Sequence, residues 1–509
     1  MSNNSSAPTL GGKKKLGVLA VTLLIIAASA PLTAVAGGVT TALAVTGNIG
    51  IPLGYIVLLV ALVIFAVGYA AMSRFITNAG AFYAYISQGL GRPFGVGSSL
   101  VALIAYNAMQ IGIYGLLGFQ ISTELSGRWG IETPWYLWVF VFIAIIAILG
   151  VNRVDIGAKI IGVLVALEFV VVIIFDIAGF ANAPQGVTTS SFDPSVLFVE
   201  GVGAVLAFGV AAFMGFESAA IYGEESKNPK TTIARATYLG VLIIGIFYAI
   251  SSWAMIVGVG QDNVVTIAAE QGPGLFFGFL GGTVGQIVAD LASLLFITSL
   301  FAALLSFHNA VARYSFSLGR EGVLPKGLAK VRQSSGAPWA GSLFQTILAV
   351  IVVGLFTLFE GTTNGQFVIP EIGLNLYPVN TMFNWLTNAG AMGLVLLMAL
   401  VSLAVVGFFV KDNRGVNLWS RMIAPILGFL ALGTIFVLIL VNFNVLIGDP
   451  DGTSIMTWLL PVIIVVPGII GVIWGAVLKS ANPKVYEQIG HGIAEDHTAG
   501  GLGESPRGI

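Results

Sequence analysis

The sequence predicts an all-α integral membrane protein with twelve transmembrane helices, arranged as a five-plus-five inverted repeat (LeuT-like) with discontinuous helices 1 and 6. Of its 509 residues, 57% are hydrophobic and 9% are charged, and the mean hydropathy is +0.96, whereas a soluble domain carries about 25% charged residues. The apolar residues gather in segments of about 20 residues, the length that crosses a bilayer. Two of these segments are interrupted by Gly or Pro at corresponding positions of two halves, which is typical of inverted repeats.

Twelve apolar segments set the expected domain organisation. The first five lie near 16–43, 51–72, 95–122, 134–151 and 156–180, and seven more lie near 198–222, 236–259, 284–310, 338–359, 379–410, 420–447 and 455–478. If segments 6–10 repeat segments 1–5, the two repeats cover 16–180 and 198–410, and the last two segments lie within 420–478. The polar ends, 1–15 and 479–509, are expected to be tails, the second one disordered.

The basic residues predict the orientation. With the amino terminus inside, every Lys and Arg except Arg128 falls on the cytoplasmic side, as the positive-inside rule requires. We therefore expect a multi-pass protein of the cytoplasmic membrane with both termini in the cytoplasm. A net charge of −1 gives no sign of a nucleic-acid partner, and 0 Cys excludes disulfides and thiolate metal sites. We expect no cofactor and no metal, and the sequence leaves the oligomeric state open.

The two interrupted segments predict a binding site. The first contains "AASAPLTAVAGGV" (27–39), where a Pro removes a backbone donor and Gly weakens the helix. Irregular backbone at membrane depth is tolerated where it lines a cavity, and its free polar groups attract a carboxylate or an ammonium. Alternatively, Gly and Pro only kink or pack these helices. The expected substrate-binding residues are Ser29, Ala30, Pro31, Leu32, Thr33 and Gly37 in the first segment and Phe208, Gly209, Phe213 and Gly215 in the sixth.

Three further motifs carry a family resemblance. "FMGFESAAIYGEESKNPKTTIARAT" (213–237), "NAVARYSFSLGREGVLPKGLAKV" (309–331) and "RFITNAGAFYAYISQGLGRPFG" (74–95) resemble sequences of the amino acid–polyamine–organocation (APC) superfamily of permeases. The resemblance covers roughly residues 15–480. It implies twelve helices in a five-plus-five repeat and transport of a small amine or amino acid.

The chain departs from the family pattern at two places. Many members carry a Gly-rich stretch in the first span, where this chain has "SAPLTAVAGG". Relatives that occlude arginine place an aromatic gate six residues before the acid of span six, where this chain has Ala211. The side-chain lining therefore does not transfer, and Phe208 or Phe213 would have to serve as the gate.

Two acidic residues inside apolar segments are candidates for proton or ion coupling, since an ionisable group in a membrane span is a functional hypothesis by default. Glu217 follows the interruption of the sixth segment and would either clamp a helix junction or handle protons. Glu168 lies in "LVALEFVVVIIF" and would take up and release a proton, bind a cation, or pair with a polar group across the bundle. In the family that the chain resembles, span five often carries a Lys near the position of Glu168, where sodium-coupled relatives hold a sodium ion.

Other polar residues also lie in the apolar segments. Asp176 and Asp290 lie near outer ends, where water can reach them. Asn107 and Gln110 of the third span would border the substrate, since the family resemblance implies a substrate contact for Asn107; both would otherwise join helices. His308, near the end of its span, is expected to be structural.

The function predicted is secondary active transport of an amino acid or related amine by alternating access, coupled to protons. The alternatives are a non-transporting membrane amino-acid sensor and a sodium-coupled or exchange transporter of another small organic cation. No nucleotide-binding loop and no catalytic constellation favours a pump or an enzyme. The expected partners are a small-molecule amino acid or amine, a proton or sodium ion, and membrane lipid.

Overall fold

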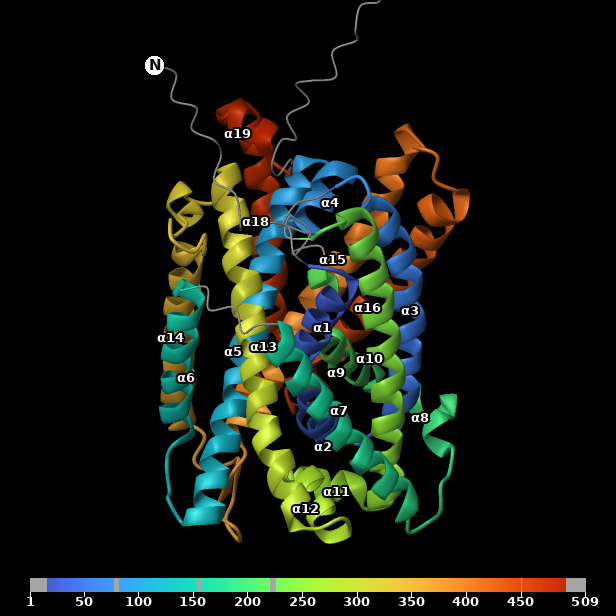
Figure 1. The fold of residues 1–509 in the computed structure, drawn as a ribbon, viewed down its shortest axis with the longest axis vertical. Helices are drawn as coiled ribbons and strands as arrows, with labels where there is room; N and C mark the ends of the chain where they lie inside the picture. The colour runs from blue at the N-terminus through green and yellow to red at the C-terminus, as the bar shows by residue number, and fades with distance from the viewer. Residues whose placement is uncertain (1–15, 77–81, 153–157, 220–225, 450, 491–509) are drawn as a thin grey trace, which may run out of the picture.

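The computed structural model describes residues 16–76, 82–152, 158–219, 226–449 and 451–490, and it is a bundle of helices (Figure 1). Its first half contains α1 (Val18–Ser29), the π-helix η1 (Thr33–Val39), α2 (Thr40–Thr46), α3 (Ile51–Met72), α4 (Phe82–Gly89), α5 (Arg92–Trp129), α6 (Trp135–Asn152), α7 (Ala158–Ala181), the 3₁₀ turn η2 (Ser190–Phe192), α8 (Pro194–Leu197), α9 (Val202–Phe213) and the 3₁₀ turn η3 (Phe216–Ala219). Of the predicted tails 1–15 and 479–509, residues 1–15 and 491–509 lie outside the described residues, whereas 479–490 contains the end of one helix, at Ala481, and the short helix Pro483–Gln488.

The second half is also helical apart from one short hairpin. It contains α10 (Pro229–Val259), α11 (Val264–Gln271), α12 (Gly274–Thr283), α13 (Gln286–Glu321), the 3₁₀ turn η5 (Lys326–Ala329), α14 (Trp339–Glu360), the π-helix η6 (Pro378–Phe383), α15 (Asn384–Lys411), the π-helix η7 (Trp419–Ile423), α16 (Ala424–Val441), α17 (Phe443–Leu446), α18 (Met456–Ala481) and α19 (Pro483–Gln488). Strands β1 (Val368–Ile369) and β2 (Leu374–Asn375) pair antiparallel, with Val368 opposite Asn375.

Eleven helices of the described chain are long and apolar enough to cross a membrane. They coincide with all the predicted segments except 198–222, where the structure has the twelve-residue helix α9, a break and the turn η3. The pair α11 and α12, bent by 114°, would make a twelfth span by length and composition, and the sequence did not predict it. The protein is therefore an all-α multi-pass membrane protein with eleven to twelve apolar helices.

The outer helices carry the apolar surface that a bilayer requires. On α14 and α18, Leu358 is 75% exposed and Ile473 is 59% exposed, and α6 and α14 lie together at one side of the bundle (Figure 1). By contrast, every residue of α9 except Ala211 is buried. The hydrophobic core therefore surrounds α9 and the first span, which lie at the centre.

Small residues let the long helices approach closely. Helix α18 packs along α5, and a Cβ atom added to Gly97 would lie 2.6 Å from the carbonyl oxygen of Gly468. A Cβ atom added to Gly471 would lie 2.8 Å from the Cα atom of Gly97. Close backbone contact of this kind is how membrane helices use Gly, and it accounts for part of the 65 Gly in the chain.

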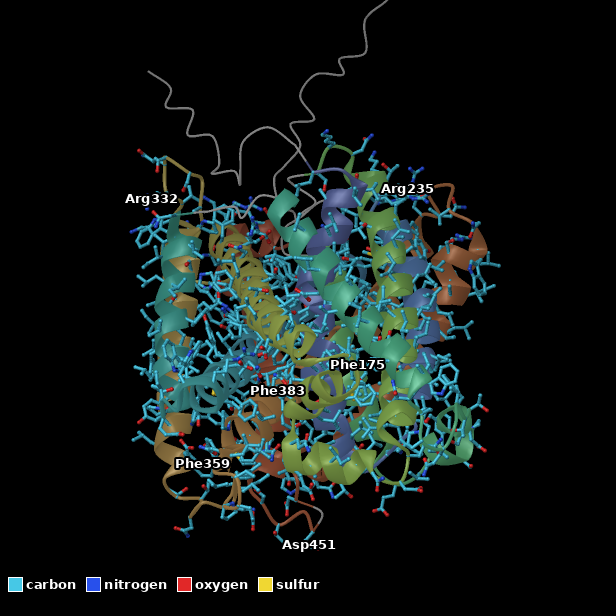
Figure 2. The ribbon with its side chains drawn as sticks, turned by 60° about the horizontal axis from the view of Figure 1, so that its bottom comes forward. Phe175, Arg235, Arg332, Phe359, Phe383 and Asp451 are labelled. Atoms are coloured by element: carbon cyan, nitrogen blue, oxygen red, sulfur yellow. The ribbon has the colours of Figure 1, made fainter. Side chains whose placement is uncertain are left out.

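The two ends of the bundle differ in charge. Arg235 and Arg332 lie at one end of the molecule, and Asp451 lies at the opposite end (Figure 2). The labelled Phe383 lies between them. Helices α4 and α19 lie at the end that carries the two arginines, and α11 and α12 at the other (Figure 1).

Candidate functional site

The first span is irregular at its middle. Helix α1 ends at Ser29, and Ala30 takes the left-handed conformation with φ 46° and ψ 81°. Pro31 follows, and after it the chain winds as the π-helix η1 before it returns to α-helix at Thr40. A non-glycine residue in the left-handed region and a π-helical segment are both enriched at functional sites.

The sixth predicted segment breaks at the same depth. Helix α9 ends at Phe213, Met214 leaves the helical region with ψ 138°, and Gly215 has φ 111°. A Cβ atom on Gly215 would lie 2.6 Å from the Cβ atom of Ala28. Only glycine therefore fits here, for reasons of both conformation and space, and the two irregular segments lie against each other.

Side chains from neighbouring helices hold both breaks in place. The hydroxyl of Tyr248, on α10, donates to the carbonyl oxygen of Ser29 over 3.1 Å. Glu217 accepts from the Tyr106 hydroxyl over 2.9 Å and from the Gly215 backbone N–H over 3.0 Å, and its own carbonyl oxygen accepts from Tyr69. These contacts join the backbone at the break after α9 to α3 and α5, and the role of Glu217 stays a prediction.

Glu168 reaches the first break from α7. It is 1% exposed, and its Oε2 atom accepts from the Ser299 hydroxyl over 2.8 Å and from the Leu32 backbone N–H over 3.4 Å. The Ser299 hydroxyl lies 3.1 Å from the Thr33 hydroxyl. Since Ser299 donates its only proton to Glu168, Thr33 must donate to Ser299. A chain of hydrogen bonds thus runs from Thr33 to the carboxylate.

A cavity of about 40 Å³ lies where the two irregular segments meet α5, α13 and the start of α15. Its wall carries three hydroxyls, three phenyl rings and two longer aliphatic side chains: Ser29, Thr33 and Thr387; Phe208, Phe307 and Phe383; Met109 and Ile113. The remainder of the wall is small: Ala28, Ala30, Ala34, Gly38, Ala211, Ala212 and Ala303. No lining residue is charged.

The cavity lies at mid-membrane depth. The lining residues Thr33, Met109 and Ala303 are within two residues of the midpoints of the helical span Val18–Thr46, of α5 and of α13, respectively. Two π-helical segments border it, η1 through Thr33 and η6 through Phe383. The cavity therefore lies near the middle of the helices that are long enough to cross a membrane.

The structure brings four of the predicted substrate residues to this cavity, namely Ser29, Ala30, Thr33 and Phe208. The others from the two irregular segments lie behind its wall: Pro31, Leu32, Gly37, Gly209, Phe213 and Gly215. Leu32 contributes its N–H to Glu168, while a Cβ atom on Gly37 would lie 2.6 Å from Leu116 and one on Gly209 would lie 2.3 Å from Leu58.

The predicted residues of the third span face away from the cavity. Asn107 lines a separate apolar cavity of about 590 Å³ between α5, α14, α15 and α18, and its Nδ2 atom donates to the Leu103 carbonyl. Gln110 belongs to a buried polar cluster, in which it accepts from Gln345 and lies 3.5 Å from His308. His308 also contacts the Ser342 hydroxyl over 2.6 Å, in agreement with a structural role.

Two expectations about acidic residues have different outcomes. Asp176 was expected to reach water, and this is wrong: it is 7% exposed, because α10 packs against α7 there and Ser251 donates to it over 2.9 Å. Asp290 pairs with Arg128 over 3.0 Å at the end of the bundle that carries Asp451, and its side chain is 37% exposed.

Most of the lining was not found from the sequence. Met109 and Ile113 lie one turn apart on α5, next to the more conspicuous Asn107 and Gln110. Ala303 and Phe307 show the same spacing on α13. The only available signal was a run of small residues, Ala211 and Ala212, beside the predicted Phe208.

Comparison with known proteins agrees with this architecture. A family described as amino acid permease matches residues 16–469. The branched-chain amino acid permease BcaP of Lactococcus lactis subsp. cremoris (strain MG1363) is 27% identical over 318 residues, which cover 58% of this chain and 65% of that protein. The serine/threonine exchanger SteT of Bacillus subtilis (strain 168) is 26% identical over 285 residues, covering 55% of this chain and 62% of that protein.

A third relative is named as a transporter of an amine, putrescine. The putrescine transporter PotE of Haemophilus influenzae (strain ATCC 51907 / DSM 11121 / KW20 / Rd) is 26% identical over 402 residues, covering 75% of this chain and 85% of that protein. The aligned region spans less than two thirds of BcaP and of SteT. The resemblance to APC permeases is confirmed, and the chain belongs to the amino acid permease family.

Proposed function

We propose that this protein is a secondary active transporter of an amino acid or related amine, and that it works by alternating access around the mid-membrane cavity with coupling to protons through Glu168. The named relatives transport or exchange amino acids or putrescine. The observation that carries the proposal is the cavity itself, which adjoins two irregular segments and connects by hydrogen bonds to a buried carboxylate.

Under this proposal the first and sixth spans are discontinuous helices of an inverted repeat, and their backbone binds the charged α-groups of the substrate. Pro31 has no N–H, so the carbonyl of Ala27 lacks its usual helical donor and is suited to an ammonium. Met214 and Gly215 separate α9 from η3, which leaves a second helix end beside the first. Helix ends of this kind bind carboxylates and ammonium groups at the bilayer midplane.

Coupling would run through the Thr33, Ser299 and Glu168 side chains. With Thr33 donating to Ser299, its oxygen can only accept, which is what an ammonium group of the substrate requires. No described Lys or Arg pairs with Glu168. A carboxyl group without a cationic partner at this depth is suited to gain and lose a proton as the cavity opens to either side.

The proposal also includes the orientation of the protein in the membrane. The end that carries Arg235, Arg332, α4 and α19 would face the cytoplasm, with both termini on that side. Access would alternate by movement of α1 and α9 relative to α5 and α13, because all four helices line the cavity.

Counterflow in proteoliposomes tests transport. Vesicles loaded with unlabelled leucine, alanine, arginine or putrescine should take up the same labelled compound faster than empty vesicles. A protein that binds a substrate in a thermal-shift assay without counterflow would be a sensor, not a transporter.

Glu168→Gln tests the coupling. The variant is expected to lose accumulation driven by an inside-alkaline pH gradient while counterflow continues, because exchange needs no net proton movement. Asp176→Asn is the matched control, since it neutralises another buried carboxyl group on α7 and should retain accumulation. Full proton-driven accumulation by Glu168→Gln, or accumulation that follows a sodium gradient alone, would contradict proton coupling through this residue.

A further inference from the structure

We infer that the substrate is a neutral amino acid with an aliphatic side chain, rather than a diamine or a cationic amino acid. This inference rests on the proposed function and specifies the substrate of the same cavity. It concerns the part of the substrate that the irregular backbone does not hold, namely the side chain.

The wall offers contact only to uncharged groups. Beyond Ser29, Thr33 and Thr387, the lining consists of alkyl groups, phenyl rings and a thioether, contributed among others by Met109, Ile113 and Phe307. Aliphatic groups gain free energy on such a surface in proportion to the area they bury. A second ammonium or a guanidinium would instead lose its hydration there.

The hydroxyls of the wall already have partners. Ser29 donates to the carbonyl of Ile26 over 2.9 Å, and Thr387 donates to the carbonyl of Phe383 over 2.7 Å. Thr33 donates to Ser299, as described above. No hydroxyl proton therefore remains for a polar substrate side chain.

The two nearby carboxylates do not supply a counter-ion for such a cation. Each oxygen of Glu217 already accepts one hydrogen bond, from the Tyr106 hydroxyl or from the Gly215 N–H. Glu168 lies behind Thr33 and Ser299, and neither acid lines the cavity. A second positive charge on the substrate would therefore be buried without a partner, which is strongly unfavourable.

Aromatic rings bound the space. The phenyl rings of Phe208, Phe307 and Phe383 all line the cavity, whereas Ala303 and the other alanines leave room beside them. This apolar lining suits a substrate side chain made of carbon atoms.

Competition against labelled leucine uptake tests the inference with the purified full chain in proteoliposomes. Unlabelled valine and alanine should compete, whereas arginine and putrescine should compete at least about 100-fold more weakly than leucine. Arginine or putrescine transported as well as leucine, or better, would overturn the inference and leave the proposed transport function standing. If no compound of the panel shows counterflow, the proposed function fails, and the substrate assignment fails with it.

A variant links the selectivity to this cavity. Ala303→Val adds two methyl groups to the wall and is expected to weaken leucine competition about 10-fold or more, while alanine changes less. Gly433→Ala is the control, because a Cβ atom at Gly433 meets nothing within 4 Å. If Ala303→Val folds by size-exclusion chromatography and treats leucine as the unmodified protein does, the cavity is not the side-chain site. If it does not fold, the competition panel with the unmodified protein decides the assignment.

Discussion

The hydrogen bond from Tyr106 to Glu217 allows a quantitative test of the site's framework. Tyr106→Phe removes one hydroxyl from a fully buried ring without changing its shape. In the structure this hydroxyl donates to Glu217 Oε1 over 2.9 Å, while the Gly215 N–H donates to Oε2 over 3.0 Å. The Glu217 side chain is 0% exposed, so water cannot replace the lost donor.

Two ranges of hydrogen-bond free energy bound the expected loss in the free energy of unfolding. Hydrogen bonds to charged groups contribute about 1.5–3 kcal/mol, and hydrogen bonds between membrane helices reach at most about 1.7 kcal/mol. The ranges overlap near about 1.5 kcal/mol. We therefore expect Tyr106→Phe to lower the free energy of unfolding by about this amount, which is close to a tenfold change in the equilibrium constant.

The assay is unfolding by titration with a denaturing detergent, followed by tryptophan fluorescence of the 9 Trp. Tyr114→Phe is the matched control, because Tyr114 is equally buried on α5 and its hydroxyl makes no hydrogen bond among the described residues. In a Glu217→Gln background the effect of Tyr106→Phe should shrink, since a neutral acceptor forms a weaker bond. If Tyr106→Phe and Tyr114→Phe lower the free energy of unfolding equally, the hydrogen bond from Tyr106 to Glu217 does not stabilise the protein.

Three further predictions concern packing and the two ends of the bundle. Gly203→Ala should lower folded yield and melting temperature while Gly433→Ala leaves both unchanged, because a Cβ atom at Gly203 would lie 1.9 Å from the carbonyl oxygen of Leu438 and one at Gly433 meets nothing within 4 Å; equal behaviour would refute this. A chain that ends before Gly490 loses the backbone hydrogen bonds that this residue makes to α4 and to the end of α13, so hydrogen–deuterium exchange in α4 should rise, and unchanged exchange would show that the docked end is dispensable. Hydrogen bonds from the loop that follows, first of all from a backbone N–H, hold the pKa of Asp449 below its ordinary value. Its stabilising contribution is therefore complete above about pH 4 and lost as the pH falls through the lower folded value, and Asp449→Asn should abolish the acid-induced rise in exchange in this loop.

The positions of the long helices could be read from the sequence because membrane insertion depends on local composition. A stretch of about 20 apolar residues satisfies its own backbone as a helix wherever it lies in the bundle. The segment 198–222 is the exception, since α9 alone is too short for a span. The bent pair α11 and α12 escaped prediction because polar residues such as Glu270 interrupt its apolar run.

The irregular backbone was also accessible from local chemistry. Pro31 follows Ala30 in the left-handed region, and Gly215 occupies a conformation that other residues rarely adopt. The partners of the buried acids could not be predicted in the same way. Glu168 and Glu217 were expected to be coupling residues. Their partners Ser299 and Tyr106 lie 131 and 111 residues away along the chain, so the local sequence does not indicate them.

The amino-acid sequence by itself determined that this chain spans a membrane and which segments are apolar, because both properties depend on residues that are neighbours along the chain. Only the tertiary structure decided which face of each helix meets the cavity. Membrane helices are apolar on every side, so their pattern does not encode their rotation. Met109 and Ile113 thus line the cavity while Asn107 and Gln110 do not, because packing against α13, α15 and α18 sets how α5 is turned.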